Sequence, residues 1–259
     1  MPRSKKTPRS RAARNKETIN EIEDSLSQNI INPNPLKRQI KLKQFPWTPR
    51  QKDFFKIALD KDTKVIFLNG PAGTAKTLLS VYCGLQLLNL KAVSDIMYLR
   101  SAVESSDRSL GYLPGSAEEK LRFFNLPFLD KLEELLHEGR ASKLEQEKRI
   151  SMFPVNFARG MNWTAKCVIL DEAQNSTIKE IITVLTRLGE GCKCFILADP
   201  MQTDLKNFDI MGGYEKLIEV FSDKESKEMG IHTFSFGEED IMRSKLVKFL
   251  ITKLKSVER

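Results

Sequence analysis

Five short apolar runs without alternating polar residues restrict the fold of this chain more than any other feature of its 259-residue sequence. They are VIFLN (65–69), DIMYLR (95–100), CVILD (167–171), CKCFILAD (192–199) and IHTFSF (231–236). Such runs suit strands buried on both faces, as in parallel sheets. Helical patterns separate them, at 77–90, about 117–137, 178–188, 213–221 and 240–255. The sequence therefore predicts an α/β fold, with a mostly parallel sheet and helices on both faces. The charged stretch 137–149 is expected to form an exposed insertion.

Residues 1–44 are predicted to form a basic, partly disordered N-terminal arm, and residues 45–259 to form the α/β domain. The segment Met1–Lys16 contains seven Lys and Arg residues and no acidic residue, so most of the net charge of +8 lies there. Such a segment is either a disordered, solubilising tail or a contact for phosphate backbones. Helical spacing of apolar residues predicts a short helix within 17–30, ended by the breaker NPNP at 32–35. Thr48 and Pro49 suit the N-cap and first turn of the next helix.

The rarer residues argue against several classes of protein. The four cysteines form no C-x-x-C pair and three of them lie inside apolar runs, which indicates reduced, buried thiols in a cytosolic protein. Two histidines, His137 and His232, are too few to favour zinc chemistry or a Ser-His-Asp triad. No apolar stretch reaches the length of a membrane span, so no membrane association is expected. The predicted location is the cytoplasm of a bacterial cell or of a phage-infected host.

A glycine-rich turn stands between the first apolar run and the helical pattern that follows it. Strand, glycine-rich turn and helix are the context of a phosphate-binding loop, in which backbone N–H groups and the helix N-terminus attract phosphates. The turn is GPAGTAKT, made of Gly70, Pro71, Ala72, Gly73, Thr74, Ala75, Lys76 and Thr77. Lys76 would reach the β- and γ-phosphates, and the Thr77 hydroxyl would bind Mg²⁺. Ala75 stands where the pattern has glycine, and it fits there without cost if its φ is negative.

Acidic residues at the end of another apolar run strengthen this interpretation. Asp171 and Glu172 end the run CVILD, where carboxylates are costly to bury unless they have partners. We expect Asp171 to hold Mg²⁺ and Glu172 to activate the attacking water. In LADPMQTDL a strand again ends in a polar turn, which contains Asp199 and Gln202. The Gln202 amide is suited to sense the γ-phosphate, because it both donates and accepts hydrogen bonds.

These segments together resemble the PhoH family, whose core is a RecA-like P-loop ATPase related to superfamily 1 helicases. The resemblance runs from Thr48 to near the C-terminus. It rests on LRSAVESSDRSLGYLPG, FARGMNW, LDEAQNST, LTRLGEGCK, ADPMQTDL and DIMRSKLV, in the order of the family. This chain departs from the family at Ala75 and at Ala198, where glycine is common. The resemblance implies an ATPase that uses ATP and Mg²⁺, and it implies that Gln51 in TPRQKDFF reads the adenine base.

The resemblance also bears on assembly and partners. A single RecA-like core and the lack of an arginine in the phosphate-loop and acidic-strand segments suggest that a neighbouring subunit supplies one. Arg187 and Arg243 are the candidates, each with a structural ion pair as the alternative. We therefore expect a homo-oligomer, for which a hexameric ring is one form.

Single-stranded RNA is the expected partner, with DNA as the alternative, because family members are associated with RNA. Cations near aromatic residues could contact the strand: Arg100, Arg108, Lys120 and Arg159, with Trp163 close by. Three functions stay open. The first is an RNA-dependent ATPase or helicase. The second is a metal-dependent RNase on the same core. The third is a nucleotide-gated binding module that hydrolyses little ATP.

Overall fold

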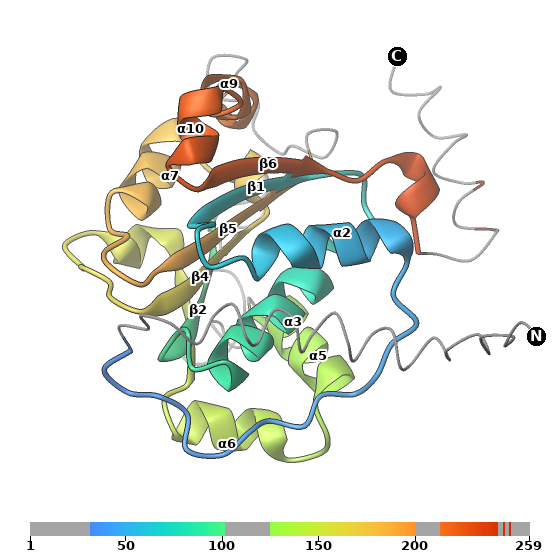
Figure 1. The fold of residues 1–259 in the computed structure, drawn as a ribbon, viewed down its shortest axis with the longest axis vertical. Helices are drawn as coiled ribbons and strands as arrows, with labels where there is room; N and C mark the ends of the chain where they lie inside the picture. Colours follow the sequence, from blue (N-terminus) through green and yellow to red (C-terminus); the bar gives the residue numbers. More distant parts are fainter. Residues whose placement is uncertain (1–31, 102–124, 200–212, 243–245, 247–248, 250–259) are drawn as a thin grey trace, which may run out of the picture.

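The computed structural model describes residues 32–101, 125–199, 213–242, 246 and 249. Within these ranges the chain forms a parallel sheet with the strand order β3-β2-β4-β5-β1-β6. Helices cover both faces of this sheet (Figure 1). The predicted α/β, RecA-like architecture is confirmed.

The strands lie almost where the apolar runs place them. Their bounds are β1 Val65–Asn69, β2 Asp95–Arg100, β3 Ile150–Pro154, β4 Lys166–Asp171, β5 Lys193–Ala198 and β6 Ile231–Ser235. The sequence analysis missed β3, which lies at the edge of the sheet and is only half-buried along its middle. β5 lies between β1 and β4, so the strand before the glycine-rich turn and the acidic strand are not neighbours.

Side chains alternate along the strands between two hydrophobic clusters, one on each face of the sheet. The larger cluster joins alternate residues such as Ile66 and Leu68 to α2 (Pro49–Ala58), α3 (Lys76–Asn89), α5 (Leu126–Leu135) and α6 (Arg140–Gln146). The other joins Val65 and Phe67 to α7 (Ile178–Leu185) and α9 (Gly213–Val220). The helix α10 (Lys224–Glu228) follows α9 and contacts β6. The two groups of helices lie on opposite sides of the sheet in Figure 1.

The start of α2 confirms the expected N-cap. The Thr48 hydroxyl accepts a hydrogen bond from the Gln51 backbone N–H at 3.2 Å, and the Gln51 side-chain oxygen accepts one from the Thr48 N–H at 2.9 Å. This reciprocal capping box satisfies two N–H groups that a helix start leaves without partners. Pro49 occupies the first turn, as its fixed φ allows.

The stretch 137–149 is largely exposed, as its charge suggested, but it is anchored to the fold by two buried residues. It contains α6, whose Leu144 is fully buried, and it ends in Arg149, which is only 7% exposed. The charged residues of α6 face outward, and one apolar side chain anchors the helix to α5 and the sheet. A single buried leucine in a seven-residue helix gives too weak a periodicity to be recognised from the sequence.

Part of the predicted arm is built into the fold. Leu36 and Ile40 are buried in the larger hydrophobic cluster. Directly after the arm, the rings of Phe45 and Trp47 stack on each other beside α2 and α3. Residues 1–31, with the basic segment and the predicted helix, lie outside the described residues. So does most of the predicted helix 240–255, of which Asp240 belongs to a short 3-10 turn, Glu238–Asp240.

Two further expectations concern the chemistry of the fold. All four cysteines are free and buried, and burial raises the pKa of the Cys83 and Cys194 thiols well above their ordinary value. None of the helices in the described ranges combines the length and apolar character that a membrane span requires.

Candidate nucleotide-binding site

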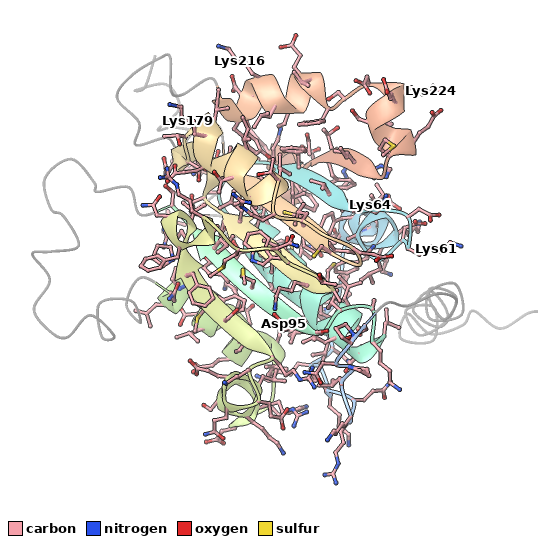
Figure 2. The ribbon with its side chains drawn as sticks, turned by 90° about the vertical axis from the view of Figure 1, so that its left-hand side faces the viewer. Lys61, Lys64, Asp95, Lys179, Lys216 and Lys224 are labelled. Carbon is pink, nitrogen blue, oxygen red and sulfur yellow. The ribbon has the colours of Figure 1, made fainter. Side chains whose placement is uncertain are left out.

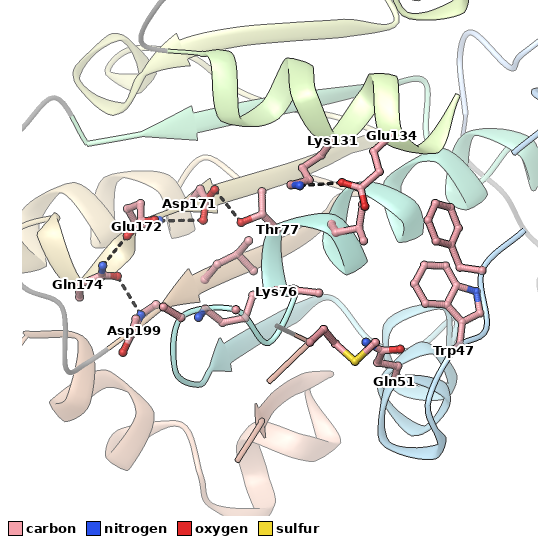
Figure 3. Close-up of a pocket in the computed structure, with 18 of the residues that line it drawn as sticks. Trp47, Gln51, Lys76, Thr77, Lys131, Glu134, Asp171, Glu172, Gln174 and Asp199 are labelled. Carbon is pink, nitrogen blue, oxygen red and sulfur yellow. Dashed lines mark hydrogen bonds and ion pairs between the residues drawn. The ribbon is translucent and has the colours of Figure 1, made fainter. Parts of the chain in front are cut away.

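A pocket of about 470 Å³ opens at the carboxyl ends of β1, β4 and β5 (Figure 3). It is lined by the glycine-rich turn, the start of α3, the acidic end of β4 and the segment before α2. Ligands of parallel α/β sheets bind at this edge, because loops from several strands converge there. The structure thus brings together the turn and the carboxylates that the sequence singled out.

The turn Gly70–Thr77 is folded as a loop around the start of α3. Gly70 has a φ of 154°, and a side chain there would meet the backbone of Phe236 at 3.0 Å. Thr74 is fully buried, and its hydroxyl donates a 2.8 Å hydrogen bond to the Pro71 carbonyl. The Lys76 ammonium donates to the carbonyls of Gly70 at 2.6 Å and Pro71 at 3.2 Å. The lysine therefore lies across the mouth of its own loop, where phosphate groups can replace the carbonyls as its acceptors.

Ala75 does not meet the condition under which alanine is free of cost. Its φ is 66° and its ψ is 23°, so it lies in the left-handed region. An L-residue with a side chain pays on the order of 1–2 kcal/mol there, whereas glycine does not. The departure from the glycine pattern is therefore a point of backbone strain at the N-terminus of α3.

The carboxylate of Asp171 is held from three sides. Its Oδ2 accepts hydrogen bonds from the Thr77 hydroxyl at 3.0 Å and from the Tyr98 hydroxyl at 2.8 Å. Its Oδ1 accepts one from the Glu172 backbone N–H at 3.0 Å. Asp171 is 4% exposed, so these donors compensate for the loss of hydration. The predicted metal residues, Thr77 and Asp171, thus lie in direct contact.

Glu172 follows in a left-handed conformation, with a φ of 54°. The Gln174 amide donates a 2.6 Å hydrogen bond to Glu172 Oε2, and its oxygen accepts one from the Asp199 N–H at 3.0 Å. Gln174 thereby connects the ends of β4 and β5, as the dashed lines of Figure 3 show. Burial and the nearby Asp171 charge raise the pKa of Glu172.

The charges in the pocket are mostly negative. Burial lowers the pKa of Lys76, while the charges of Asp199, Glu172 and Asp171 oppose that shift. Lys131 and Glu134 of α5 also line the pocket and form an ion pair with an N–O distance of 2.7 Å. Because the carboxylates around Lys76 outnumber its single positive charge, the pocket has an excess of negative charge that favours binding of an additional cation.

The far end of the pocket, away from the carboxylates, is aromatic and apolar. Phe45, Trp47 and Met242 line it together with Gln51. Gln51 is 3% exposed and serves as the third residue of the capping box, so it is not a solvated helix residue. A flat apolar wall beside a buried amide suits a heteroaromatic base.

Of the two arginines proposed to act on the nucleotide, Arg187 does not line the pocket of its own chain. Arg187 follows α7, and its backbone oxygen accepts a hydrogen bond from the Trp163 N–H. Trp163 precedes β4, so this contact lies at the amino ends of the strands, whereas the nucleotide pocket lies at their carboxyl ends. Gln202 and Arg243 lie outside the described residues. Arg100 instead ends β2 beside Asp171 in register, and its charge opposes the upward shift of the Glu172 pKa.

Of the residues expected to contact nucleic acid, some are accessible, one is buried, and two lie outside the described residues. Trp163 is 1% exposed and belongs to the hydrophobic core, so its ring has no face open to a base. Arg159 is exposed, whereas Arg108 and Lys120 lie outside the described residues. The sequence analysis assigned no role to Tyr98, Gln174, Trp47 or Lys131. Gln174 lies within the segment LDEAQNST, which is a signal that could have found it, whereas the other three lie in no recognised motif.

Comparison with known proteins gives a consistent result. The family model described as "PhoH-like protein" matches residues 44–255. A PhoH-like protein of Synechocystis is 33% identical over 204 residues, which cover 79% of this chain and 60% of that protein. A PhoH-like protein of Bacillus subtilis is 32% identical over 234 residues, covering 90% and 70%. Protein PhoH of Escherichia coli is 32% identical over 185 residues, covering 71% and 51%. The chain thus spans less than two thirds of the Synechocystis and Escherichia coli proteins.

Proposed function

The chain belongs to the PhoH-like protein family, and on this premise we propose that it binds ATP with Mg²⁺ and hydrolyses it. The observation that carries the proposal is the contact between Thr77 at the start of α3 and Asp171 at the end of β4. It joins a phosphate-type loop to an acidic strand across an intervening strand. The aromatic and apolar wall at Trp47 supports adenine binding at the other end of the pocket.

The residues present fit a magnesium ion. The Thr77 hydroxyl and the Asp171 carboxylate offer hard oxygen ligands 3.0 Å apart, in a pocket whose other charges are mainly negative. Mg²⁺ is commonly held by one or two protein oxygens, with water and substrate phosphates completing the octahedron. When bound, the ion would neutralise charge on the phosphate oxygens.

The chain's own residues supply the remaining roles. Lys76 would turn from the Gly70 and Pro71 carbonyls to the β- and γ-phosphates. Glu172, whose pKa is raised, would accept a proton from the attacking water, and a raised pKa makes a carboxylate a stronger base. Gln174 would keep that carboxylate oriented while connecting it to the backbone of Asp199.

The test is the steady-state ATPase rate of the purified chain, beside Lys76→Ala, Glu172→Gln and the control Lys179→Ala on the exposed face of α7. We expect Glu172→Gln to bind a fluorescent ATP analogue and to lose about 10²-fold or more in turnover. Lys76→Ala should lose affinity as well. Turnover that survives both changes would exclude this site as the source of hydrolysis.

We propose single-stranded RNA as the partner that couples to this ATPase. The support is the basic N-terminal segment and the family membership. Adding RNA or DNA oligonucleotides to the same assay tests it, with stimulation by RNA as the expected result. RNA cleavage that persists in Lys76→Ala would favour the alternative, a metal-dependent RNase.

We also propose that the protein acts as a homo-oligomer, with a hexameric ring as one form. Arg187 lies near the amino ends of the strands, whereas the pocket of its own chain lies at their carboxyl ends. In this proposal Arg187 therefore acts on the nucleotide of a neighbouring subunit. Phe157 and Ile182 expose 61% and 46% of their surface on η2 (Val155–Ala158) and α7, which pack together beside it. Light scattering that finds a monomer with full turnover would remove this proposal.

The strain at Ala75 favours one second candidate function, a nucleotide-gated binding module. A left-handed alanine at the start of α3 could hold the loop in a state that binds ATP without rapid turnover. This candidate predicts tight binding of ATP with no measurable hydrolysis, with or without RNA.

A further inference from the structure

A second pocket, of about 420 Å³, lies between the N-terminal segment and α6. It is basic: Lys37, Arg38, Arg140, Lys143 and Arg149 line it, with Glu147 as the single carboxylate. We call these six residues and the space they enclose the basic pocket. It adjoins the amino ends of β2 and β3, because Arg149 directly precedes β3 and donates to the carbonyl of Ser94, just before β2. The nucleotide site lies at the opposite edge of the sheet.

Arg149 forms the floor of the basic pocket and ties its two walls together. One guanidinium nitrogen donates to the Asn34 carbonyl at 2.6 Å and the Ser94 carbonyl at 2.8 Å. The other donates to the Asn34 side-chain oxygen at 3.0 Å. All of these acceptors are neutral, so they satisfy its hydrogen bonds without cancelling its charge. The buried guanidinium therefore contributes a positive potential to the pocket.

The wall formed by residues 34–40 is fixed in place. Leu36 and Ile40 are buried in the core, and Asn89 of α3 exchanges hydrogen bonds of 2.7 and 2.9 Å with the backbone of Ile40. Lys37 and Arg38 lie between these two anchors and are exposed. The fold thus presents two cations beside α6 without a further cost of ordering the backbone.

The cations of the basic pocket have little compensation. Among the described residues, no ion pair involves Lys37, Arg38 or Arg140. Lys143 approaches Glu147 at 3.9 Å, with both side chains about half exposed. Gathering like charges around one cavity is unfavourable in the free protein, and an anionic ligand with several charges would relieve it.

We propose that the basic pocket binds the phosphate backbone of a single-stranded nucleic acid, with Lys37, Arg38 and Arg140 as the phosphate contacts. A polynucleotide fits better than a single phosphate for two reasons. The cations lie on two walls of the pocket, so several phosphates can be contacted at once. The buried N–H groups of Arg149 already donate to protein acceptors, so they are not available to enclose one phosphate ion. The stretch 36–44 adds Lys41 and Lys43 and contains no acidic residue. None of the described residues that line the pocket is aromatic, so binding should be tolerant of sequence and sensitive to salt.

The inference rests on the proposed nucleic-acid partner but concerns a separate site from the one that holds ATP. Its wall at residues 34–40 precedes the segment that the family model matches, which begins at residue 44. The pocket can therefore be tested by binding alone, without reference to hydrolysis.

The experiment is fluorescence anisotropy of a labelled single-stranded oligonucleotide with the full chain, titrated over a range of salt concentrations. The double variant Lys37→Ala, Arg140→Ala should lower the slope of log affinity against log salt by about 1.4, since each single-strand contact contributes about 0.7. At physiological salt this corresponds to a loss of affinity on the order of tenfold. Lys37→Ala alone, at an exposed position, should give about half of the slope change.

The matched control is Lys179→Ala, Lys216→Ala, which removes two exposed lysines from α7 and α9 at the other end of the molecule (Figure 2). It should bind as the wild type does. Wild-type protein that binds no oligonucleotide would remove both the proposed partner and this site. Wild-type binding that the pocket variants leave unchanged would overturn the site alone. A second experiment is calorimetry with inorganic pyrophosphate while a non-hydrolysable ATP analogue fills the nucleotide site. If the pocket variants lose pyrophosphate binding but keep oligonucleotide binding, the basic pocket is a small-anion site and the proposal is overturned.

Discussion

The hydroxyl of Tyr98 on β2 donates a 2.8 Å hydrogen bond to Asp171 Oδ2 at the end of β4. Tyr98 is fully buried, and its ring stacks on Phe128 of α5 with a centroid distance of 4.7 Å. Burial and the Asp171 charge raise the pKa of Tyr98 well above its ordinary value, so the hydroxyl remains a donor at physiological pH. Tyr98 is therefore a positioning residue for the carboxylate that we expect to hold Mg²⁺.

Tyr98→Phe should raise the Mg²⁺ concentration needed for half-maximal nucleotide binding by about 10-fold or more, as loss of a residue that orients a metal ligand commonly does. The ring and its stacking on Phe128 are retained, so the fold should survive. A magnesium titration of a fluorescent ATP analogue measures this without depending on turnover. The control is Tyr214→Phe, which removes a buried hydroxyl that donates to the Ile196 carbonyl on the α9 side of the sheet. Equal magnesium midpoints for the two variants would contradict the assignment.

Ala75→Gly should relieve the strain at a φ of 66°. We expect the free energy of unfolding to rise by up to about 1 kcal/mol, because glycine adopts this conformation freely while losing more entropy on folding. Urea unfolding measures the change. Ala72→Gly in the same loop is the control, since Ala72 is not among the residues with positive φ. It should leave the protein equally or less stable, and the reverse ranking of the two variants would show that the alanine is not strained.

Gln51→Ala should have two separable effects. Loss of the capping box should cost about 1 kcal/mol of stability, and loss of the amide should reduce the preference for ATP over GTP. Thr48→Ala removes the other half of the same capping box without lining the pocket. It should lower stability similarly and leave the nucleotide preference intact. If both variants keep that preference, Gln51 serves only the helix.

Lys193 should make stability depend on pH. It is 7% exposed at the start of β5, and it donates to the carbonyls of Ala58 at 3.3 Å and of Asp60. Burial lowers its pKa from 10.5 to about 8. Between these two values the unfolded chain binds more protons at this group than the folded chain does. The contribution of Lys193 to stability should therefore rise across that window, by on the order of 3 kcal/mol.

Urea unfolding at about pH 7 and about pH 10 measures this change. Lys193→Met should remove the pH dependence that Lys193 contributes, whereas Lys64→Met, at an exposed position, should retain it. A wild-type profile in Lys193→Met would mean that the buried lysine does not titrate in this range.

Much of the framework of the site could be predicted from local sequence. The strands β1, β4 and β5 are continuous apolar runs, and residues that end such runs in a parallel sheet meet at one edge. This pattern by itself places the turn Gly70–Thr77 near Asp171 and Glu172. The capping box at Thr48 is equally local. The edge strand β3 was missed because its half-buried middle does not form such a run.

The hydrogen bonds that orient the carboxylates of the site depend on which strands are neighbours in the sheet. The strand order cannot be predicted from any short segment of the sequence. Tyr98 reaches Asp171 because β2 pairs with β4, and Gln174 reaches Asp199 because β4 pairs with β5. Tyr98 lies in an apolar run and Gln174 in LDEAQNST, and neither segment shows which strand lies beside it. The conformation of Ala75 likewise depends on the closure of the whole loop, so the residue type alone could not decide whether alanine is tolerated there.

The contacts of Arg149 with the N-terminal segment show that the segment matched by the family model and the set of residues that fold together are not the same. The match to the family model begins at residue 44, but Leu36 and Ile40 fill the core and Asn34 supplies acceptors to a buried guanidinium. A chain shortened to residue 44 would lose these contacts together and leave a cation without the groups that compensate for its desolvation. We therefore expect the unit that unfolds cooperatively to be longer than the segment that the family model matches.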